Sequence, residues 1–339
     1  MRLLRLISAP IAAIYWAITS VRNLLFDMGI LKVYEIPGKS ICVGNLNVGG
    51  SGKSPLTRYL MARLQPEFKV QVLSRGYGRK TKGHIVVQSH HNAKDVGDEA
   101  LQYFFDQADE VHVCKRRKDA ILTMNRSENC VLLLDDAFQH RYVSAGVNIL
   151  VSDYNRPFFR DYLMPMGELR EGRSGAKRAD VIVFTKCPMD ISQAAKESYL
   201  EALIPLKTPV FFSHVHYLPL RSIGAHVVEN PEHVLLVTGI ANPAPLEKHL
   251  LNHYTVTHLP FGDHFPYSLQ NLREIHRKFT TFELEKTIII TTEKDLMRMQ
   301  EKSMKVEMSK YPWYLQPIEI TFDREEALIK IIRDYVRKN

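Results

Sequence analysis

The sequence predicts an α/β fold: an αβα sandwich, a second, smaller α/β domain, and an N-terminal helix that lies on a membrane surface. Apolar runs rich in β-branched residues alternate with helix-like stretches, which is typical of βαβ units and a mostly parallel sheet. The first set of runs is Ile41–Val43, Val70–Leu73, Val131–Leu134, Val147–Val151 and Val181–Phe184. A further set, which begins near Val234–Val237 and continues through Ile288–Thr291, predicts the second domain.

Helix-like stretches separate or accompany these runs, at 55–64, 99–107, 116–124, 245–251, 269–278 and 324–337. The length of 339 residues favours two domains of ordinary size. We expect an N-terminal membrane-associated helix at 1–28, a first α/β domain at 29–208, a hinge ribbon at 209–232 and a C-terminal α/β domain at 233–339.

One glycine-rich segment carries the strongest sign of chemistry. It reads Asn47-Val48-Gly49-Gly50-Ser51-Gly52-Lys53-Ser54, after an apolar strand and before a helix, as a Walker A loop requires. The glycines let backbone N–H groups wrap the phosphates, Lys53 reaches the β- and γ-phosphates, and Ser54 ligates Mg²⁺. Asn47 replaces the usual first glycine, a mild departure because asparagine tolerates left-handed backbone. The alternative is a glycine-rich turn with a chance Lys-Ser pair. We therefore expect a P-loop NTPase-like domain that binds ATP with Mg²⁺.

Two pairs of acids are candidates for the chemistry around the phosphates. Asp135 and Asp136 end an apolar strand about 80 residues after the P-loop, the Walker B pattern that places a carboxylate on Mg²⁺ or its waters; strand-end turn residues are the alternative. Asp98 and Glu99 follow Gly97 at an expected helix start. A structural interpretation is that their charges stabilise the helix terminus. The functional alternative is that they supply a base for an acceptor hydroxyl.

Several loop residues have both a structural and a functional interpretation. His264 lies in a loop, where a lone histidine is more often structural. The cations and the tyrosine that could recognise an anionic substrate, or merely be solvated, are Arg75, Tyr77, Arg79, Arg170 and Arg173. The segment 185–188 resembles the start of a guanine-reading motif, but Pro188 stands where its aspartate would be, which argues against a GTPase.

The composition narrows the class of partner. The net charge of +8 suits nucleic acid, an acidic membrane or a phosphorylated substrate. No basic run with interleaved aromatic residues occurs, which argues against nucleic acid, and no protein partner is evident. The four cysteines form no C-x-x-C pair, so neither a zinc site nor a redox motif is indicated, and we expect small buried hydrophobic residues.

The first 28 residues are unusual because Leu6–Val21 carries no charge, while Arg2, Arg5 and Arg22 flank it. The run is shorter than the roughly 20 residues of a spanning helix and contains Pro10. A signal peptide has the same order of regions, but export would carry the P-loop away from cytosolic ATP. An interfacial helix on an anionic membrane surface is favoured; a spanning helix and a core-packing helix remain alternatives.

The chain resembles the tetraacyldisaccharide 4′-kinases, the lipid A 4′-kinases of Gram-negative bacteria. The matching segments, in family order around the P-loop, are Gly44-Asn45, Ser74–Arg79, Val96–Glu99, Leu134–His140, Leu169–Glu171, Arg178–Asp180, Thr238–Ile240 and Thr292–Asp295. The short apolar N-terminal helix is also a family trait. Ala137, Gly262 and Phe265 depart from the family's usual residues, at positions that touch packing more than chemistry.

The resemblance implies a mechanism. ATP with Mg²⁺ lies on the P-loop, and a lipid A disaccharide precursor presents its 4′-hydroxyl from the cytoplasmic face of the inner membrane. Asp98 accepts the hydroxyl proton with His264 in support, and Lys53 stabilises the transferring group. Glu99, Asp135 and Asp136 are the metal-side carboxylates.

Two other classes of function compete with a lipid kinase. The chain could be a membrane-bound P-loop ATPase that acts as a switch, or a nucleotide-dependent binding protein without turnover. Steady ATP hydrolysis without lipid would favour the first, and nucleotide binding without turnover would favour the second.

Overall fold

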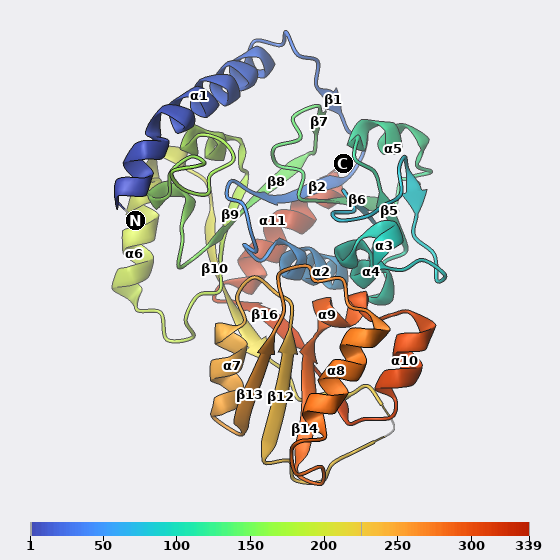
Figure 1. Ribbon diagram of the computed structural model, residues 1–339. Helices are drawn as coiled ribbons and strands as arrows, with labels where there is room; N and C mark the ends of the chain where they lie inside the picture. The colour runs from blue at the N-terminus through green and yellow to red at the C-terminus, as the bar shows by residue number, and fades with distance from the viewer. Residues whose placement is uncertain (1, 225, 339) are drawn as a thin grey trace. The chain divides into compact units, whose positions relative to one another are not determined.

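The computed structural model describes residues 2–224 and 226–338, with side chains described from residue 9 onward. The chain forms two compact units. The first, here the P-loop unit, comprises Met1–Arg75, Ala108–Val215 and Ile320–Asn339, and the second unit comprises Gly76–Gln107 and His216–Glu319. Each is described by itself below (Figure 1).

A largely parallel sheet organises the P-loop unit. Its strands are β2 (Ser40–Asn45), β3 (Lys69–Ser74), β5 (Glu110–Val113), β6 (Cys130–Asp135), β8 (Val147–Asp153), β9 (Val181–Thr185), β10 (Val210–Tyr217) and β16 (Ile318–Phe322). They follow one another across the sheet as β16-β10-β9-β8-β2-β6-β3-β5. The pairs from β10 to β5 are all parallel, so the carboxyl ends of these strands meet at one edge. The short strands β1 (Tyr34–Glu35) and β7 (Val143–Ser144) pair in parallel beside it.

Helices connect and cover these strands. The α-helices are α1 (Arg2–Asp27), α2 (Lys53–Leu64), α5 (Arg117–Thr123), α6 (Gln193–Leu203) and α11 (Glu325–Lys338), and the 3₁₀ helices are η1 (Phe158–Arg160), η2 (Arg173–Arg178) and η3 (Ile204–Leu206). Helix α2 packs against β2, β3 and β6. Strands and helices therefore alternate as the sequence predicted.

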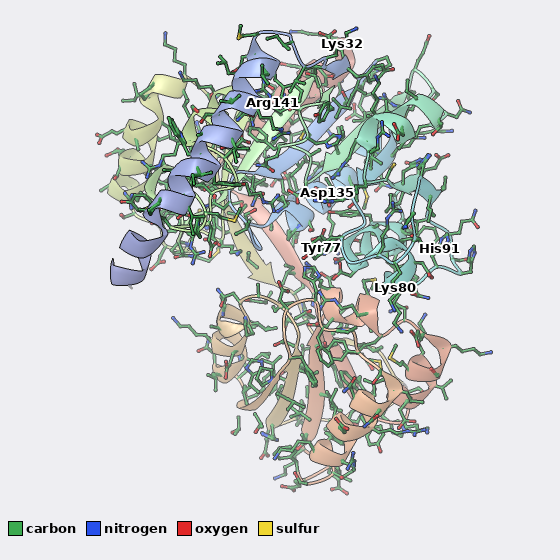
Figure 2. All side chains as sticks on the ribbon, turned by 45° about the horizontal axis from the view of Figure 1, so that its top comes forward. Lys32, Tyr77, Lys80, His91, Asp135 and Arg141 are labelled. Carbon is green, nitrogen blue, oxygen red and sulfur yellow. The ribbon has the colours of Figure 1, made fainter. Side chains whose placement is uncertain are left out.

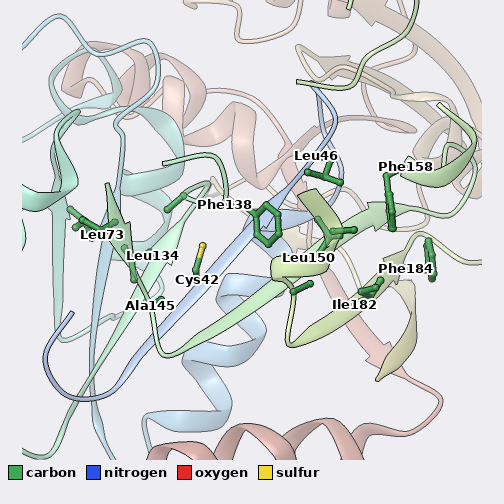
Figure 3. Packing of buried hydrophobic residues seen from close by; sticks show 14 of the residues in the cluster. Cys42, Leu46, Leu73, Leu134, Phe138, Ala145, Leu150, Phe158, Ile182 and Phe184 are labelled. Atoms are coloured by element: carbon green, nitrogen blue, oxygen red, sulfur yellow. The ribbon is translucent and has the colours of Figure 1, made fainter. Parts of the chain in front are cut away.

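The core of the P-loop unit forms because its central strands bury both faces. Figure 3 shows Cys42, Leu134, Leu150 and Ile182 among the packed side chains, and every residue of β2 and β6 is buried. All four cysteines are buried and free, as predicted. Burial raises the pKa of the Cys42 thiol to about 12, so this side chain behaves as a small apolar group.

The second unit has its own sheet and core. Its strands are β4 (Ile85–Val86), β11 (Arg221–Ser222), β12 (His233–Thr238), β13 (Thr255–Pro260), β14 (Thr287–Thr292) and β15 (Trp313–Gln316). Five of them form a sheet in the order β11-β15-β14-β12-β13, parallel except for the β11–β15 pair. The helices are α3 (Ala93–Val96), α4 (Asp98–Phe105), α7 (Ala244–Leu251), α8 (Leu269–Phe279), α9 (Glu293–Arg298) and α10 (Lys302–Met308). Figure 1 shows α7 beside β13, and α8 beside α10.

The boundaries of the two compact units differ from the expected domain ranges 29–208, 209–232 and 233–339. Residues 76–107 belong with the C-terminal elements, because α4 packs against α9. The expected hinge ribbon begins with β10, which extends the main sheet by pairing with β9. Sequence continuity gave no sign of either arrangement, since both depend on contacts between segments far apart in the chain.

Helix α1 has two different faces. Ala12, Thr19 and Phe26 are buried against the P-loop unit. The rest of the helix surface carries large apolar side chains that are 54–63% exposed: Ile11, Ile14, Trp16, Ile18, Val21 and Leu24. Among the described residues, one helical segment, Ala9–Asp27, has the length and apolar composition to cross a membrane. Length and composition alone do not distinguish crossing from lying on the surface.

Candidate active site

The P-loop connects the carboxyl end of β2 to the first turn of α2. Gly52, the residue before α2, has φ 87°, and a side chain there would approach the Thr185 side chain to about 3.0 Å. Thr185 in turn donates a hydrogen bond to the Ser51 carbonyl at 2.7 Å. Only glycine fits this left-handed, crowded position. The loop is thereby held with the N-terminus of α2 available to an anion.

Asn47 takes a conformation that the sequence did not predict. Its backbone does not have positive φ, so its tolerance of left-handed backbone is not used. Instead Asn47 forms an antiparallel bridge with Leu169, and its side-chain amide donates to Asp161 Oδ2 at 2.7 Å. The next residue, Val48, donates its N–H to the Glu168 carbonyl at 2.8 Å. The start of the loop is therefore fixed by the 161–169 segment.

Lys53 is held by two polar side chains from the ends of β2 and β6. Its ammonium donates to Asn45 Oδ1 at 3.3 Å and lies 3.6 Å from Asp136 Oδ1. Burial alone would raise the pKa of Asp136, but Lys53, then Arg170, outweigh it, so the pKa lies below its usual range. Asp136 is therefore an ionised carboxylate that orients the lysine.

Two arginines complete this part of the site. Arg170 Nη1 lies 3.1 and 3.2 Å from the two Asp136 oxygens and 3.3 Å from Gln139 Oε1. Arg117 is only 3% exposed and donates to the backbone carbonyls of Asp135 and Asp136 at 3.2 and 3.1 Å. Arg117 and Gln139 were not assigned a role from sequence, although Gln139 lies in a motif that carries the family resemblance.

The residues around the P-loop fit a magnesium nucleotide. Within the described part of the chain, the Asn45 amide nitrogen and the Ser51 hydroxyl are buried without a hydrogen-bond partner, so both are donors ready for phosphate oxygens. The Ser54 hydroxyl in the first turn of α2 and the carboxylates after β6 are the oxygen ligands that Mg²⁺ prefers. No group of three metal-binding side chains is preformed among residues 2–224 and 226–338, as expected where phosphates and water supply most ligands.

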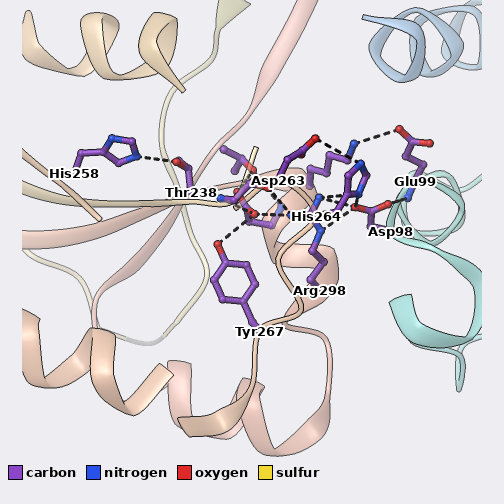
Figure 4. Close-up of polar contacts among 12 residues, drawn as sticks. Asp98, Glu99, Thr238, His258, Asp263, His264, Tyr267 and Arg298 are labelled. Atoms are coloured by element: carbon purple, nitrogen blue, oxygen red, sulfur yellow. Dashed lines mark hydrogen bonds and ion pairs between the residues drawn. The ribbon is translucent and has the colours of Figure 1, made fainter. Parts of the chain in front are cut away.

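The second predicted centre, Asp98 with His264, lies within the second unit (Figure 4). Asp98 begins α4 and is 5% exposed. Its Oδ2 accepts from His264 Nδ1 at 3.0 Å and from Arg298 Nε and Nη2 at 2.8 and 2.6 Å. Burial alone would raise the pKa of Asp98, but the His264 bond and the charges of Lys294 and Arg298 hold it well below its usual range. Asp98 is therefore an ionised carboxylate.

The contacts of His264 define its tautomer. Arg298 Nη2 also lies 3.4 Å from Nδ1, but Arg298 can only donate, and the shorter contact to Asp98 requires a proton on Nδ1. In the neutral ring Nε2 is then the basic nitrogen. Its nearest acid is Asp263 at 3.9 Å, the ring is 30% exposed, and the Tyr77 ring lies 5.1 Å away.

A buried hydrogen-bond network fixes Arg298, the ion-pair partner of Asp98. Asp295 is fully buried; its Oδ1 accepts from Arg298 Nη1 at 3.0 Å and from the Gly239 N–H at 3.0 Å. Arg298 also donates to the Gly239 carbonyl at 2.7 Å. Sequence reasoning gave neither residue a role, and the only signal was the family motif 292–295. Glu99, predicted on the metal side, accepts a hydrogen bond from Lys294 at 3.3 Å.

The predicted substrate-recognition residues do not all belong to the same unit. Arg170 and Arg173 belong to the P-loop unit, and Arg173 donates to the Asp161 carbonyl at 2.8 Å. Arg75 is exposed just after β3, in the same unit. Tyr77, 62% exposed, and Arg79, which donates to the Gly83 carbonyl at 2.6 Å, belong to the second unit.

Comparison with known proteins decides the family. The profile of the tetraacyldisaccharide-1-P 4′-kinases matches residues 4–337. The chain belongs to this kinase family. It is 39% identical to the tetraacyldisaccharide 4′-kinase of Flavobacterium psychrophilum, with 100% of this chain and 99% of that one covered. The kinase of Phocaeicola vulgatus is 38% identical, with coverage of 97% and 94%.

A solved structure of the same family has the same fold. The crystal structure of LpxK from Aquifex aeolicus, described as an "apo" form in complex with ATP, matches with a TM-score of 0.75 and 28% identity, over 98% of this chain and 99% of that one. The predicted α/β class with an apolar N-terminal helix is thereby confirmed, and the chain is an enzyme of the 4′-kinase family.

Proposed function

We propose that this chain transfers the γ-phosphoryl group of ATP to the 4′-hydroxyl of the tetraacyldisaccharide 1-phosphate precursor of lipid A. The proposal is based on two features of one family member: a P-loop whose Lys53 is oriented by Asp136, and a hydrogen-bonded pair of the buried Asp98 with the partly exposed His264. Kinases need both parts, because one neutralises the phosphates and the other takes the acceptor proton.

The P-loop unit supplies electrostatic stabilisation. Lys53 and the unpaired donors of Asn45 and Ser51 are suited to bind phosphate oxygens, and Arg170 adds a second cation. Ser54, Asp135 and Asp136 would hold Mg²⁺, with Glu99 as a further candidate; when bound, the ion shields the phosphate charge. Preformed donors of this kind stabilise the charge that develops during transfer.

The Asp98–His264 pair receives the proton. As the 4′-oxygen attacks the γ-phosphorus, the bond to the bridging oxygen of ADP breaks and the hydroxyl proton leaves. Asp98 was the base expected from sequence, with His264 in support. Oδ2 of Asp98 already accepts from three donors and Oδ1 accepts the Glu99 N–H at 2.9 Å, which supports His264 Nε2 as the atom of the pair that meets the hydroxyl. Asp98 then stabilises the imidazolium.

The location and substrate recognition follow from the same proposal. The apolar face of α1 and the net charge of +8 support binding to the anionic cytoplasmic face of the inner membrane. There the acceptor sugar lies at the surface, and Arg75, Tyr77, Arg79 and Arg173 are the proposed contacts with its anionic groups.

A transfer assay tests the proposed function. The full-length chain is incubated with labelled ATP, Mg²⁺ and detergent-dispersed tetraacyldisaccharide 1-phosphate, and the product is analysed for a phosphate at the 4′ position. A substrate analogue without the 4′-hydroxyl and the Lys53→Ala variant are the controls; the analogue should give no product, and the variant about 10²- to 10³-fold less than wild type. Steady ATP hydrolysis that is indifferent to lipid, or ATP binding without turnover, would refute a lipid kinase.

A further inference from the structure

One face of α1 contacts the segments that carry nucleotide-site residues. Tyr15, Arg22 and Asn23 lie on the same side of the helix as the buried Thr19 and Phe26. This spacing of three, four and seven residues is that of a single helical stripe. All their partners belong to the P-loop unit.

The backbone of Arg170 is held from two sides. Its N–H donates to the Leu46 carbonyl at 2.8 Å, which ties it to the residue after β2. Its carbonyl accepts the Tyr15 hydroxyl at 2.7 Å. Burial and the nearby Glu171 raise the pKa of Tyr15, so the phenol keeps the proton that it donates. The side chain of Arg170 extends from this fixed point to Asp136 at 3.1 Å.

A second pair of contacts holds the neighbouring side chains. Arg22 Nη2 donates to the Gln139 carbonyl at 2.9 Å. The Gln139 side chain accepts from Arg170 and donates to the Asn45 carbonyl, and Asn45 accepts from Lys53. The α1 stripe thus contacts the backbones of the two residues whose side chains adjoin Asp136 and Asn45.

Further contacts keep α1 in register. Asn23 Nδ2 donates to Glu171 Oε2 at 2.8 Å, and the other oxygen of Glu171 accepts from Arg178 at 2.7 Å. Arg141, labelled beside α1 in Figure 2, donates to the Asn23 carbonyl at 2.9 Å and pairs with Asp27. A helix that served only to attach the chain to lipid would not need specific polar contacts with these segments.

We infer that α1 is a positioning element for the nucleotide site, in which Tyr15 and Arg22 fix the backbones of Arg170 and Gln139 and thereby orient Asp136 and Lys53. This inference rests on the proposed function for its link to phosphoryl transfer, but its effect on Mg·ATP binding does not depend on any lipid. Tyr15 is a positioning residue, because its hydroxyl donates to the backbone carbonyl of Arg170 and acts through that residue.

Tyr15→Phe tests the inference because it removes only the hydroxyl and keeps the ring. In the full-length chain, we expect the dissociation constant of Mg·ATP, measured by calorimetry, to rise roughly 3- to 10-fold, as for the loss of one hydrogen bond. Binding to vesicles that contain anionic lipid should not change. In an Arg170→Ala background the same substitution should have no further effect, because it acts through Arg170. Ile18→Val, at a position of α1 that is 63% exposed, is the control and should leave Mg·ATP binding unchanged.

Two results would overturn the inference: unchanged Mg·ATP binding in Tyr15→Phe, or losses that add to those of Arg170→Ala. The transfer assay is separate. If the wild-type chain binds Mg·ATP but phosphorylates no lipid, the proposed function fails while the positioning role is still decided by the binding measurements.

Discussion

Asp98→Asn should destabilise the second unit as well as slow transfer. Asp98 and Arg298 are each 5% exposed, and the substitution removes the negative charge that accepts two of the arginine's hydrogen bonds. Removing one partner of a buried ion pair costs about 3–5 kcal/mol. In the variant Arg298 keeps its bonds to Asp295 and the Gly239 carbonyl, and the new amide oxygen still accepts a hydrogen bond. We therefore expect a loss of about 3 kcal/mol, at the low end of that range.

The loss should depend on pH with a defined sign. Burial alone would raise the pKa of Asp98, but His264, Lys294 and Arg298 lower it below its unfolded value. A carboxyl group with a lowered folded pKa stabilises the fold above its unfolded pKa, about 3.9, and this contribution disappears as the pH falls through the folded value. The difference in unfolding free energy between wild type and variant should therefore be complete near neutral pH and shrink below about pH 4.

Denaturant unfolding at several pH values measures this difference, and transfer kinetics should show a fall in kcat of about 10²- to 10⁴-fold. Asp263→Asn, an exposed acid in the loop of His264, is the control and should leave stability nearly unchanged. Equal stability of wild type and Asp98→Asn at neutral pH, or a difference that grows on acidification, would refute the ion-pair reasoning.

Three further outcomes follow from the site and from α1. Lys53→Ala should lower transfer by about 10²- to 10³-fold, and chelation of divalent ions by EDTA should abolish transfer until excess Mg²⁺ restores it. Wild-type rates in the variant or in EDTA would contradict the P-loop assignment. In rate measurements, Asp98→Asn and His264→Gln should be far from additive in the double variant, because a pair that acts as a unit is disabled by either change. Ile14→Ser with Ile18→Ser removes apolar surface worth about 1–2 kcal/mol each, so vesicle flotation should show binding weakened roughly 30- to 700-fold while Mg·ATP binding stays normal.

The sequence predicted most of the local structure. The helix expected at 269–278 is α8, Leu269–Phe279, which begins with the Ser268–Asn271 capping box, and the helix expected at 324–337 is α11, Glu325–Lys338. The P-loop lies between β2 and α2 as the motif requires. Helix bounds and the position of the P-loop depend on residues close together in the chain, so a pattern within about ten positions is enough to predict them.

Long-range polar contacts could not be predicted in this way. Asp98 and Arg298 are 200 positions apart, and no periodicity links a helix N-terminus to an arginine in another helix. Asn47 was expected to tolerate a left-handed backbone and instead forms a bridge with Leu169. Arg117 is buried because it contacts carbonyl groups at the end of β6, whereas a sequence pattern gives an arginine in a helix as a surface residue.

Because α1 has two different faces, deletion of the whole helix cannot separate its two proposed roles. If α1 were a separable anchor, deleting residues 1–28 would weaken lipid binding and spare ATP binding. The structure instead connects α1 to the P-loop residues, because Tyr15 and Arg22 contact the backbones of Arg170 and Gln139. Loss of both functions in the truncated chain would therefore not distinguish an anchor from a positioning element. Substitutions on one face at a time do so, since Tyr15 and Arg22 contact Arg170 and Gln139 whereas Ile14 and Ile18 are each 63% exposed.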